Sequence, residues 1–126
     1  MLHLLLDNGY FPVVTIPIIS DQGEALNTDA DRAAAALAGA LKADTLVLLS
    51  NVPGLLKDPA DPSTRIAIIP KGELEGFAQY AQDRMKKKVL GAREALEAGV
   101  SRVAFGSANR ANPVSGALSG EGTLIS

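Results

Sequence analysis

The chain is 126 residues long, with 47% hydrophobic and 21% charged residues, which is the composition of one ordinary globular domain. It has no cysteine and one histidine, His3, which excludes disulfide frameworks and thiolate metal sites and argues against a Ser-His-Asp triad. A net charge of −2 with 4% aromatic residues argues against nucleic-acid binding, and the apolar start at residues 2–6 is too short for a membrane span. We therefore expect a cytoplasmic protein that binds neither nucleic acid nor membrane.

Strands and helices are predicted to alternate along the chain. Residues 11–19 form a continuous apolar, β-branched run, which is typical of a buried strand. An alanine-rich helix follows and runs to about residue 42, with Thr28 and Asp31 at the spacing of a capping box. The rest of the chain is predicted to form, in order, a buried strand at 45–49, a short strand at 65–69, a helix from Pro70 to about residue 82, a helix at about 85–98 ended by Gly99, and strands at 102–105 and 123–125.

This alternation predicts an α/β fold of three layers, αβα, around a mainly parallel sheet. Ligands of such sheets collect where the strands end, which here points to residues 20–28 and 50–56. The sequence contains neither a P-loop nor a Gly-x-Gly-x-x-Gly fingerprint, so any nucleotide site is of another kind.

Polar side chains gather at the start of the alanine-rich helix. The run Leu-Asn-Thr-Asp-Ala-Asp-Arg at 26–32 is explained in full by a well-capped surface helix. The alternative is an anion site, because helix N-termini attract phosphates. Asp29 and Asp31 are two residues apart and point to different sides of a helix, so no metal site is expected.

A basic run, Arg-Met-Lys-Lys-Lys at 84–88, begins the helix that ends near Gly99. A solvated basic stripe is the usual meaning of such a run. However, cations near a helix start are disfavoured by the macrodipole and need a compensating partner, such as a polyphosphate. Lys88 precedes the apolar positions Val89, Ala92 and Leu96, so its side chain could face a cleft.

Five segments in this order resemble the C-terminal part of the amino-acid kinase family, which has the carbamate kinase-like fold. They are NGYFPVV at 8–14, LNTDAD at 26–31, LLSNVPGL at 48–55, MKKKV at 85–89 and GEGTLI at 120–125. The chain is most similar to the acetylglutamate kinase group. Asn51 and Arg84 stand where many acetylglutamate kinases have Asp and Gly, which favours the lysine-pathway branch. That branch phosphorylates 2-aminoadipate, or glutamate, held on a small acidic amino-group carrier protein.

The resemblance implies a role for each matching residue. Lys88 is expected to neutralise the transferring phosphoryl group, Asp31 to orient active-site lysine, and Asn27 to bind the acyl-amino-acid acceptor. ATP is expected with Mg²⁺ held mainly by the phosphates. The nucleotide is expected to lie against two stretches, made of Ser50, Asn51, Val52, Pro53, Gly54 and Leu55, and of Tyr80, Ala81, Gln82 and Met85.

The family's first lysine- and glycine-rich loops have no counterpart in this sequence. We therefore expect a C-terminal piece of a longer kinase, with residues 1–25 left from an acceptor-binding lobe and residues 26–126 forming the nucleotide-binding lobe. Such a chain is expected to bind ATP or ADP with negligible turnover, since phosphate-binding groups act as a unit. An exposed apolar strand at 11–19 would also favour a homodimer or higher homo-oligomer. The alternatives to a carrier-dependent aminoadipate kinase are acetylglutamate kinase, another amino-acid kinase, or a non-catalytic α/β binding module.

Overall fold

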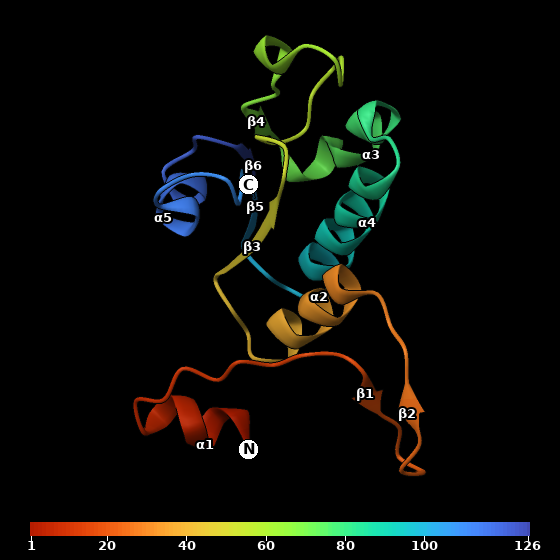
Figure 1. The fold of residues 1–126 in the computed structure, drawn as a ribbon, viewed down its shortest axis with the longest axis vertical. Helices are drawn as coiled ribbons and strands as arrows, with labels where there is room; N and C mark the ends of the chain where they lie inside the picture. The colour runs from red at the N-terminus through yellow and green to blue at the C-terminus, as the bar shows by residue number, and fades with distance from the viewer.

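A four-stranded sheet with helices on both faces forms the centre of the molecule, seen in a computed structural model that describes residues 1–126 (Figure 1). The strands are β3 (Thr45–Ser50), β4 (Ile68–Ile69), β5 (Arg102–Ser107) and β6 (Thr123–Ile125), in the spatial order β3-β5-β6-β4. Helices α2 (Ala30–Ala40), α3 (Leu74–Phe77) and α4 (Arg84–Glu97) lie on one side, and α5 (Pro113–Leu118) lies on the other. The three-layer prediction is confirmed.

The sheet is mixed, although most of its pairings are parallel as predicted. β3 and β5 run parallel along six residue pairs, from Thr45↔Arg102 to Ser50↔Ser107, and β4 and β6 are also parallel. β5 and β6 are antiparallel, because the chain returns through α5 to place β6 beside β5. The strand ends of β3 and β5 therefore lie side by side at Ser50 and Ser107.

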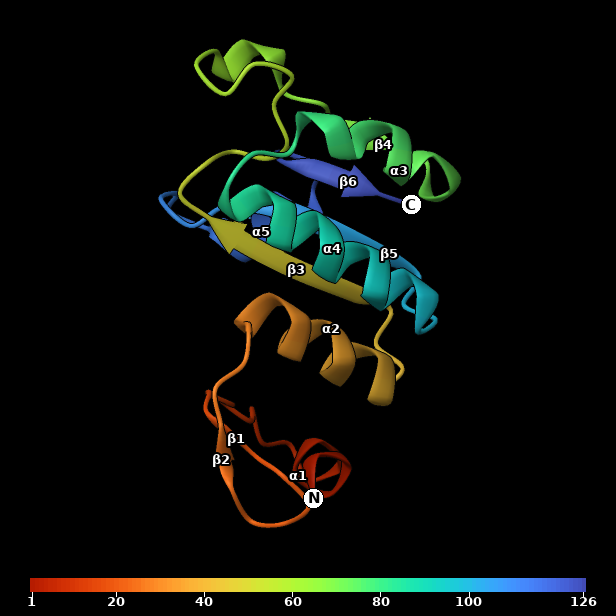
Figure 2. The same ribbon diagram turned by 90° about the vertical axis from the view of Figure 1, so that its right-hand side faces the viewer.

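The core lies between the sheet and the pair of helices α2 and α4, which run side by side (Figure 2). Phe105, Val103 and Ile125 from the sheet pack there with Ala35 of α2 and Ala92 of α4. Small residues bring the two helices very close. A Cβ at Gly91 would lie 3.1 Å from the carbonyl oxygen of Asp31, and one at Gly39 would lie 2.5 Å from the Cβ of Ala98.

Residues 1–26, called here the N-terminal segment, stand apart from residues 30–126, called the α/β body (Figure 2). The segment holds α1 (Leu2–Asp7) and a small antiparallel pair, β1 (Ile18–Ile19) and β2 (Ala25–Leu26). None of its residues is buried, and the side chain of Phe11 is 96% exposed. The predicted buried strand at 11–19 is therefore wrong, because only two of its residues pair and no sheet covers the others.

Two further expectations differ from the structure. The predicted helix from Pro70 to residue 82 is broken into 3₁₀ turns at Lys71–Glu73 and Ala78–Tyr80 around the single turn of α3. Gly72 and Gly76 lie within this stretch, and glycine disfavours a continuous helix. Helix α5 was not predicted. No helix of the structure has the length and apolar character that crossing a bilayer requires.

Candidate nucleotide-binding site

The loop after β3 is held in place by Thr123 of β6. The buried Thr123 Oγ1 accepts a hydrogen bond from the Leu55 amide at 2.8 Å and donates one to the Ile66 carbonyl at 2.7 Å. Gly54 and Gly122 allow the close approach, since a Cβ on Gly54 would lie 2.5 Å from Thr123 Oγ1 and one on Gly122 would lie 1.7 Å from the Phe105 carbonyl oxygen. The loop at 50–56 is therefore fixed against the sheet and has a defined shape.

A second loop, at 80–83, faces the first one and leads into α4. Asp83 is the residue before the helix and has φ +43° and ψ −118°, a conformation that favours glycine. Such backbone strain costs about 1–3 kcal/mol and is concentrated at functional sites. Because Asp83 makes no side-chain capping bond, the strain is not explained by helix capping.

A cavity of about 340 Å³ lies between these two loops and the start of α4. This size lies within the range of small-ligand pockets. Of the residues predicted to bind nucleotide or phosphate, the cavity is lined by Ser50, Asn51, Val52, Gly54, Leu55, Tyr80, Gln82, Met85 and Lys88. The structure thus brings together two stretches that are about 30 residues apart in the sequence.

Lys88 brings a positive charge into this cavity. Its side chain is 13% exposed, and its ammonium lies 2.9 Å from Oδ1 of Asp31 on α2. In the structure Lys88 therefore lines a cavity and contacts Asp31, while the roles expected of both residues in phosphoryl transfer stay predictions. Since a cation held at the wall of a small cavity attracts anions, the arrangement suits a phosphate group.

The start of α2 differs in detail from the predicted capping box. Asp29 is the N-cap in place of Thr28, and its Oδ1 accepts a hydrogen bond from the Arg32 amide at 3.3 Å. Its other oxygen lies 3.1 Å from the Lys87 ammonium of α4. The bond with Lys87 lowers the pKa of the Asp29 carboxyl below its ordinary value. Asp suits this N-cap position better than Thr because its two carboxylate oxygens can bind the Arg32 amide and the Lys87 ammonium at the same time.

A third ion pair continues the contact between the two helices. Arg32 of α2 binds Glu94 of α4 with distances of 2.8 Å from Nη2 and 2.9 Å from Nε. The hydrogen bond to Glu94 raises the pKa of Arg32 above its ordinary value. Asp29, Asp31 and Arg32 therefore each have their own partner on α4.

Four of the predicted residues do not line the cavity. One of them, Asp31, is linked to it only through its ion pair with Lys88. Asn27 is exposed and lies two residues before the N-cap of α2, so its role in acceptor binding stays a prediction. Pro53 lies in the same loop as the lining residues, and Ala81 belongs to the second loop but is itself buried. Sequence reasoning missed Leu56, Pro59, Asp83 and Arg84, which also line the cavity. For these last two residues the signal was the basic run, because Arg84 is its first residue and Asp83 directly precedes it.

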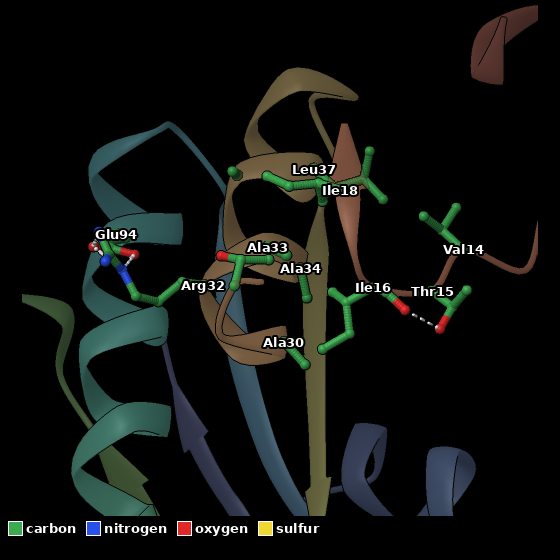
Figure 3. Close-up of a pocket in the computed structure, with 12 residues that line it drawn as sticks. Val14, Thr15, Ile16, Ile18, Ala30, Arg32, Ala33, Ala34, Leu37 and Glu94 are labelled. Atoms are coloured by element: carbon green, nitrogen blue, oxygen red, sulfur yellow. Dashed lines mark hydrogen bonds and ion pairs between the residues drawn. The ribbon is translucent and has the colours of Figure 1, made fainter. Parts of the chain in front are cut away.

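A larger groove of about 880 Å³ lies elsewhere, between the N-terminal segment and α2 (Figure 3). Val14, Ile16 and Ile18 line it from one side, and the alanines of α2 with Leu37 line it from the other. Only the pair Arg32–Glu94 brings charge to it. None of the predicted site residues lines this groove, so it is separate from the candidate nucleotide site.

No group of three or more His, Asp or Glu side chains is placed so that it could hold a metal ion.

The profile of the amino acid kinase family matches residues 1–107 of the chain. The chain is 56% identical over 126 residues to [LysW]-aminoadipate kinase of Deinococcus radiodurans, covering 100% of this chain and 43% of that protein. It is 49% identical to the same-named kinase of Thermus thermophilus, covering 99% of this chain and 47% of that protein. Acetylglutamate kinase of Methanopyrus kandleri is 37% identical, with 99% and 49% covered. The chain thus spans about half the length of the curated relatives it matches.

Solved structures agree on the fold. N-acetylglutamate synthase from Neisseria gonorrhoeae superposes with a TM-score of 0.84 at 29% identity, covering 99% of this chain and 30% of that chain. Carbamate kinase from Giardia lamblia superposes with a TM-score of 0.66 at 28% identity, covering 82% of this chain and 33% of that chain. The predicted carbamate kinase-like fold is confirmed by these neighbours.

Proposed function

This chain belongs to the amino acid kinase family, and on that premise we propose that it supplies the ATP-binding part of a kinase that phosphorylates a side-chain carboxylate. One observation carries the proposal. Lys88 lines a small cavity whose walls are the two stretches expected to hold the nucleotide, and its ammonium donates a hydrogen bond to Asp31.

The chemistry fits these residues. Phosphoryl transfer needs little covalent work from the protein, because positioning and stabilisation of charge supply most of the catalysis. In the proposed site, Lys88 neutralises the developing charge on the transferred group, and Asp31 keeps the ammonium aimed at it. Leu55, Tyr80 and Met85 offer apolar contacts to a base. ATP is the phosphoryl donor, and Mg²⁺ is held by its phosphates.

The proposed acceptor is 2-aminoadipate, or glutamate, carried on a small acidic amino-group carrier protein. The names of the two relatives with 49% and 56% identity support the aminoadipate acceptor. Arg84, Lys86 and Lys87 are exposed beside the cavity and would suit an acidic partner. Asn27 is proposed to contact the acceptor, and residues 1–25 and 26–126 are proposed as parts of an acceptor-binding and a nucleotide-binding lobe.

Acetylglutamate is the second candidate acceptor, since the relative from Methanopyrus kandleri carries that name at 37% identity. Both acceptors present a carboxylate to the same phosphoryl donor. The nucleotide site proposed here is therefore the same under either acceptor, and it is tested first.

Calorimetric titration with ADP and Mg²⁺ tests the proposal on the chain itself. Lys88→Met removes the charge at the cavity wall, and Lys86→Met is the matched control because Lys86 is exposed and makes no ion pair. Loss of a charge-assisted hydrogen bond to phosphate predicts about tenfold or greater weakening for Lys88→Met. Equal affinities for the two variants, or no binding by the folded wild-type chain, would contradict the proposal.

A further inference from the structure

Two carboxylates and two ammonium groups meet where α2 begins beside α4. Asp29 and Asp31 are two residues apart on α2, and Lys87 and Lys88 are consecutive on α4. In the structure Asp29 pairs with Lys87 at 3.1 Å and Asp31 pairs with Lys88 at 2.9 Å. The four charges therefore form two separate pairs.

This pairing is not guaranteed by the helices alone. Gly91 lets α4 approach the backbone of Asp31 so closely that the carboxylate lies within reach of long side chains on the start of α4. The Lys87 side chain is long and 65% exposed, so it is free to change rotamer. Without a partner of its own, its ammonium would be drawn to the nearest carboxylate, and Asp31 is the next one along α2.

We propose that Asp29 is a positioning residue that holds Lys87 in an ion pair and so leaves Asp31 to Lys88 alone. Its consequence for phosphoryl transfer rests on the function proposed above for Lys88. The pairing itself does not depend on that function, because it is a property of the chain without nucleotide.

The capping role of Asp29 can be separated from its charge. Asn caps helices about as well as Asp, so Asp29→Asn keeps the acceptor for the Arg32 amide while it removes the ion pair with Lys87. Lys87→Gln removes the same pair from the other side and also removes the competing ammonium. The lowered pKa of Asp29, caused mainly by Lys87, agrees with a carboxylate that is committed to this lysine.

The test measures how fast Lys88 reacts with an acylating reagent, followed by peptide mass spectrometry of the folded chain without nucleotide. Lys86 is the internal reference, since it lies on the same helix and has no ion-pair partner. In Asp29→Asn, Lys87 competes for Asp31, and the ratio of Lys88 to Lys86 labelling is expected to rise about threefold, the size of one surface ion pair. In Lys87→Gln and in the double variant the ratio is expected to stay near that of the wild type.

The decisive outcome is that the labelling ratio of Lys88 to Lys86 returns to its wild-type value when Asp29→Asn is combined with Lys87→Gln. An unchanged ratio in Asp29→Asn, or an equal rise in Lys87→Gln and in the double variant, would overturn the proposal, because the pair would then act only as a tether between helices. Arg32→Gln is the control for such a tether, since it breaks another pair between α2 and α4 and is expected to leave the ratio unchanged. The labelling readout does not use nucleotide, so a failure of nucleotide binding would count against the proposed function and not against this pairing.

Discussion

The N-terminal segment and the α/β body are both rich in apolar residues, but only the body buries them. Phe105 of the body is 1% exposed and packs between the sheet and α4, whereas Phe11 of the segment is 96% exposed. No residue before Ala35 is buried. The difference teaches that apolar residues contribute to stability only where another element covers them. The candidate nucleotide site is built on the part of the chain that has such a core.

Replacing the two phenylalanines by alanine gives the largest expected contrast. Phe105→Ala is expected to reduce the free energy of unfolding by about 3–5 kcal/mol, because it leaves a cavity in the core. Phe11→Ala is expected to change it by less than about 0.5 kcal/mol, since its side chain touches little. Urea unfolding followed by circular dichroism measures both. Similar losses of unfolding free energy for the two variants would mean that the Phe11 side chain also packs against the rest of the chain, which would contradict this contrast.

The glycines provide a second contrast. Gly122→Ala would place a Cβ 1.7 Å from the Phe105 carbonyl oxygen, so the backbone must shift at an expected cost of about 3 kcal/mol. Gly9 has φ +77°, and no atom lies within 4 Å of the place that a Cβ would take, so Gly9→Ala is expected to alter only its own turn. Thermal unfolding distinguishes the two. A comparable fall in Tm for Gly9→Ala would show that the segment unfolds together with the body.

The hydroxyl of Thr123 is expected to have an intermediate effect. Thr123→Val leaves the Leu55 amide and the Ile66 carbonyl without this partner, at an expected cost of about 2 kcal/mol. The loop at 50–56 should also become looser. Thr123→Ser keeps the hydroxyl and should be much milder. Thr15→Val, in the N-terminal segment, removes only an exposed bond to its neighbour and should have no measurable effect on urea unfolding.

The smallest expected effect is a dependence on pH at the junction between the two regions. The pKa of Asp29 is lowered below 3.8 in the folded chain, chiefly by Lys87, so the unfolded chain takes up a proton first as the pH falls. The stabilisation from the ion pair is therefore present above pH 3.8 and is lost as the pH falls below it. Urea unfolding between pH 6 and pH 3 should show a slightly steeper loss for the wild type than for Asp29→Asn. Parallel curves would contradict this.

Most of the body could be predicted because its patterns are local. The apolar run of β3 and the spacing along α4 each specify one element. The strand at 11–19 was predicted wrongly because strand formation depends on a neighbour that lies elsewhere in space. The prediction of one continuous helix after Pro70 was wrong for a local reason, since Gly72 and Gly76 interrupt that stretch.

The candidate site was predictable in its parts but not in its pairings. The resemblance to a family indicated Lys88, Asp31 and the two loops. Which lysine binds which carboxylate depends on how closely α2 and α4 approach, and this distance is set by Gly91 and Gly39 together with the core behind them. A sequence pattern contains no such distance. The contact between α2 and α4 also explains why the N-cap is Asp29 and not the predicted Thr28. Asp29 caps α2 and also forms an ion pair with Lys87 of α4.

Hydrogen–deuterium exchange with and without ADP and Mg²⁺ tests the central claim most directly, because it reports on both regions in one experiment. We predict that nucleotide slows exchange at residues 50–56 and 80–88, which contain most of the residues that line the cavity, and leaves residues 1–26 unchanged. Protection confined to residues 1–26, or none in a folded chain at saturating nucleotide, would contradict the account of a nucleotide site built by the α/β body around Lys88.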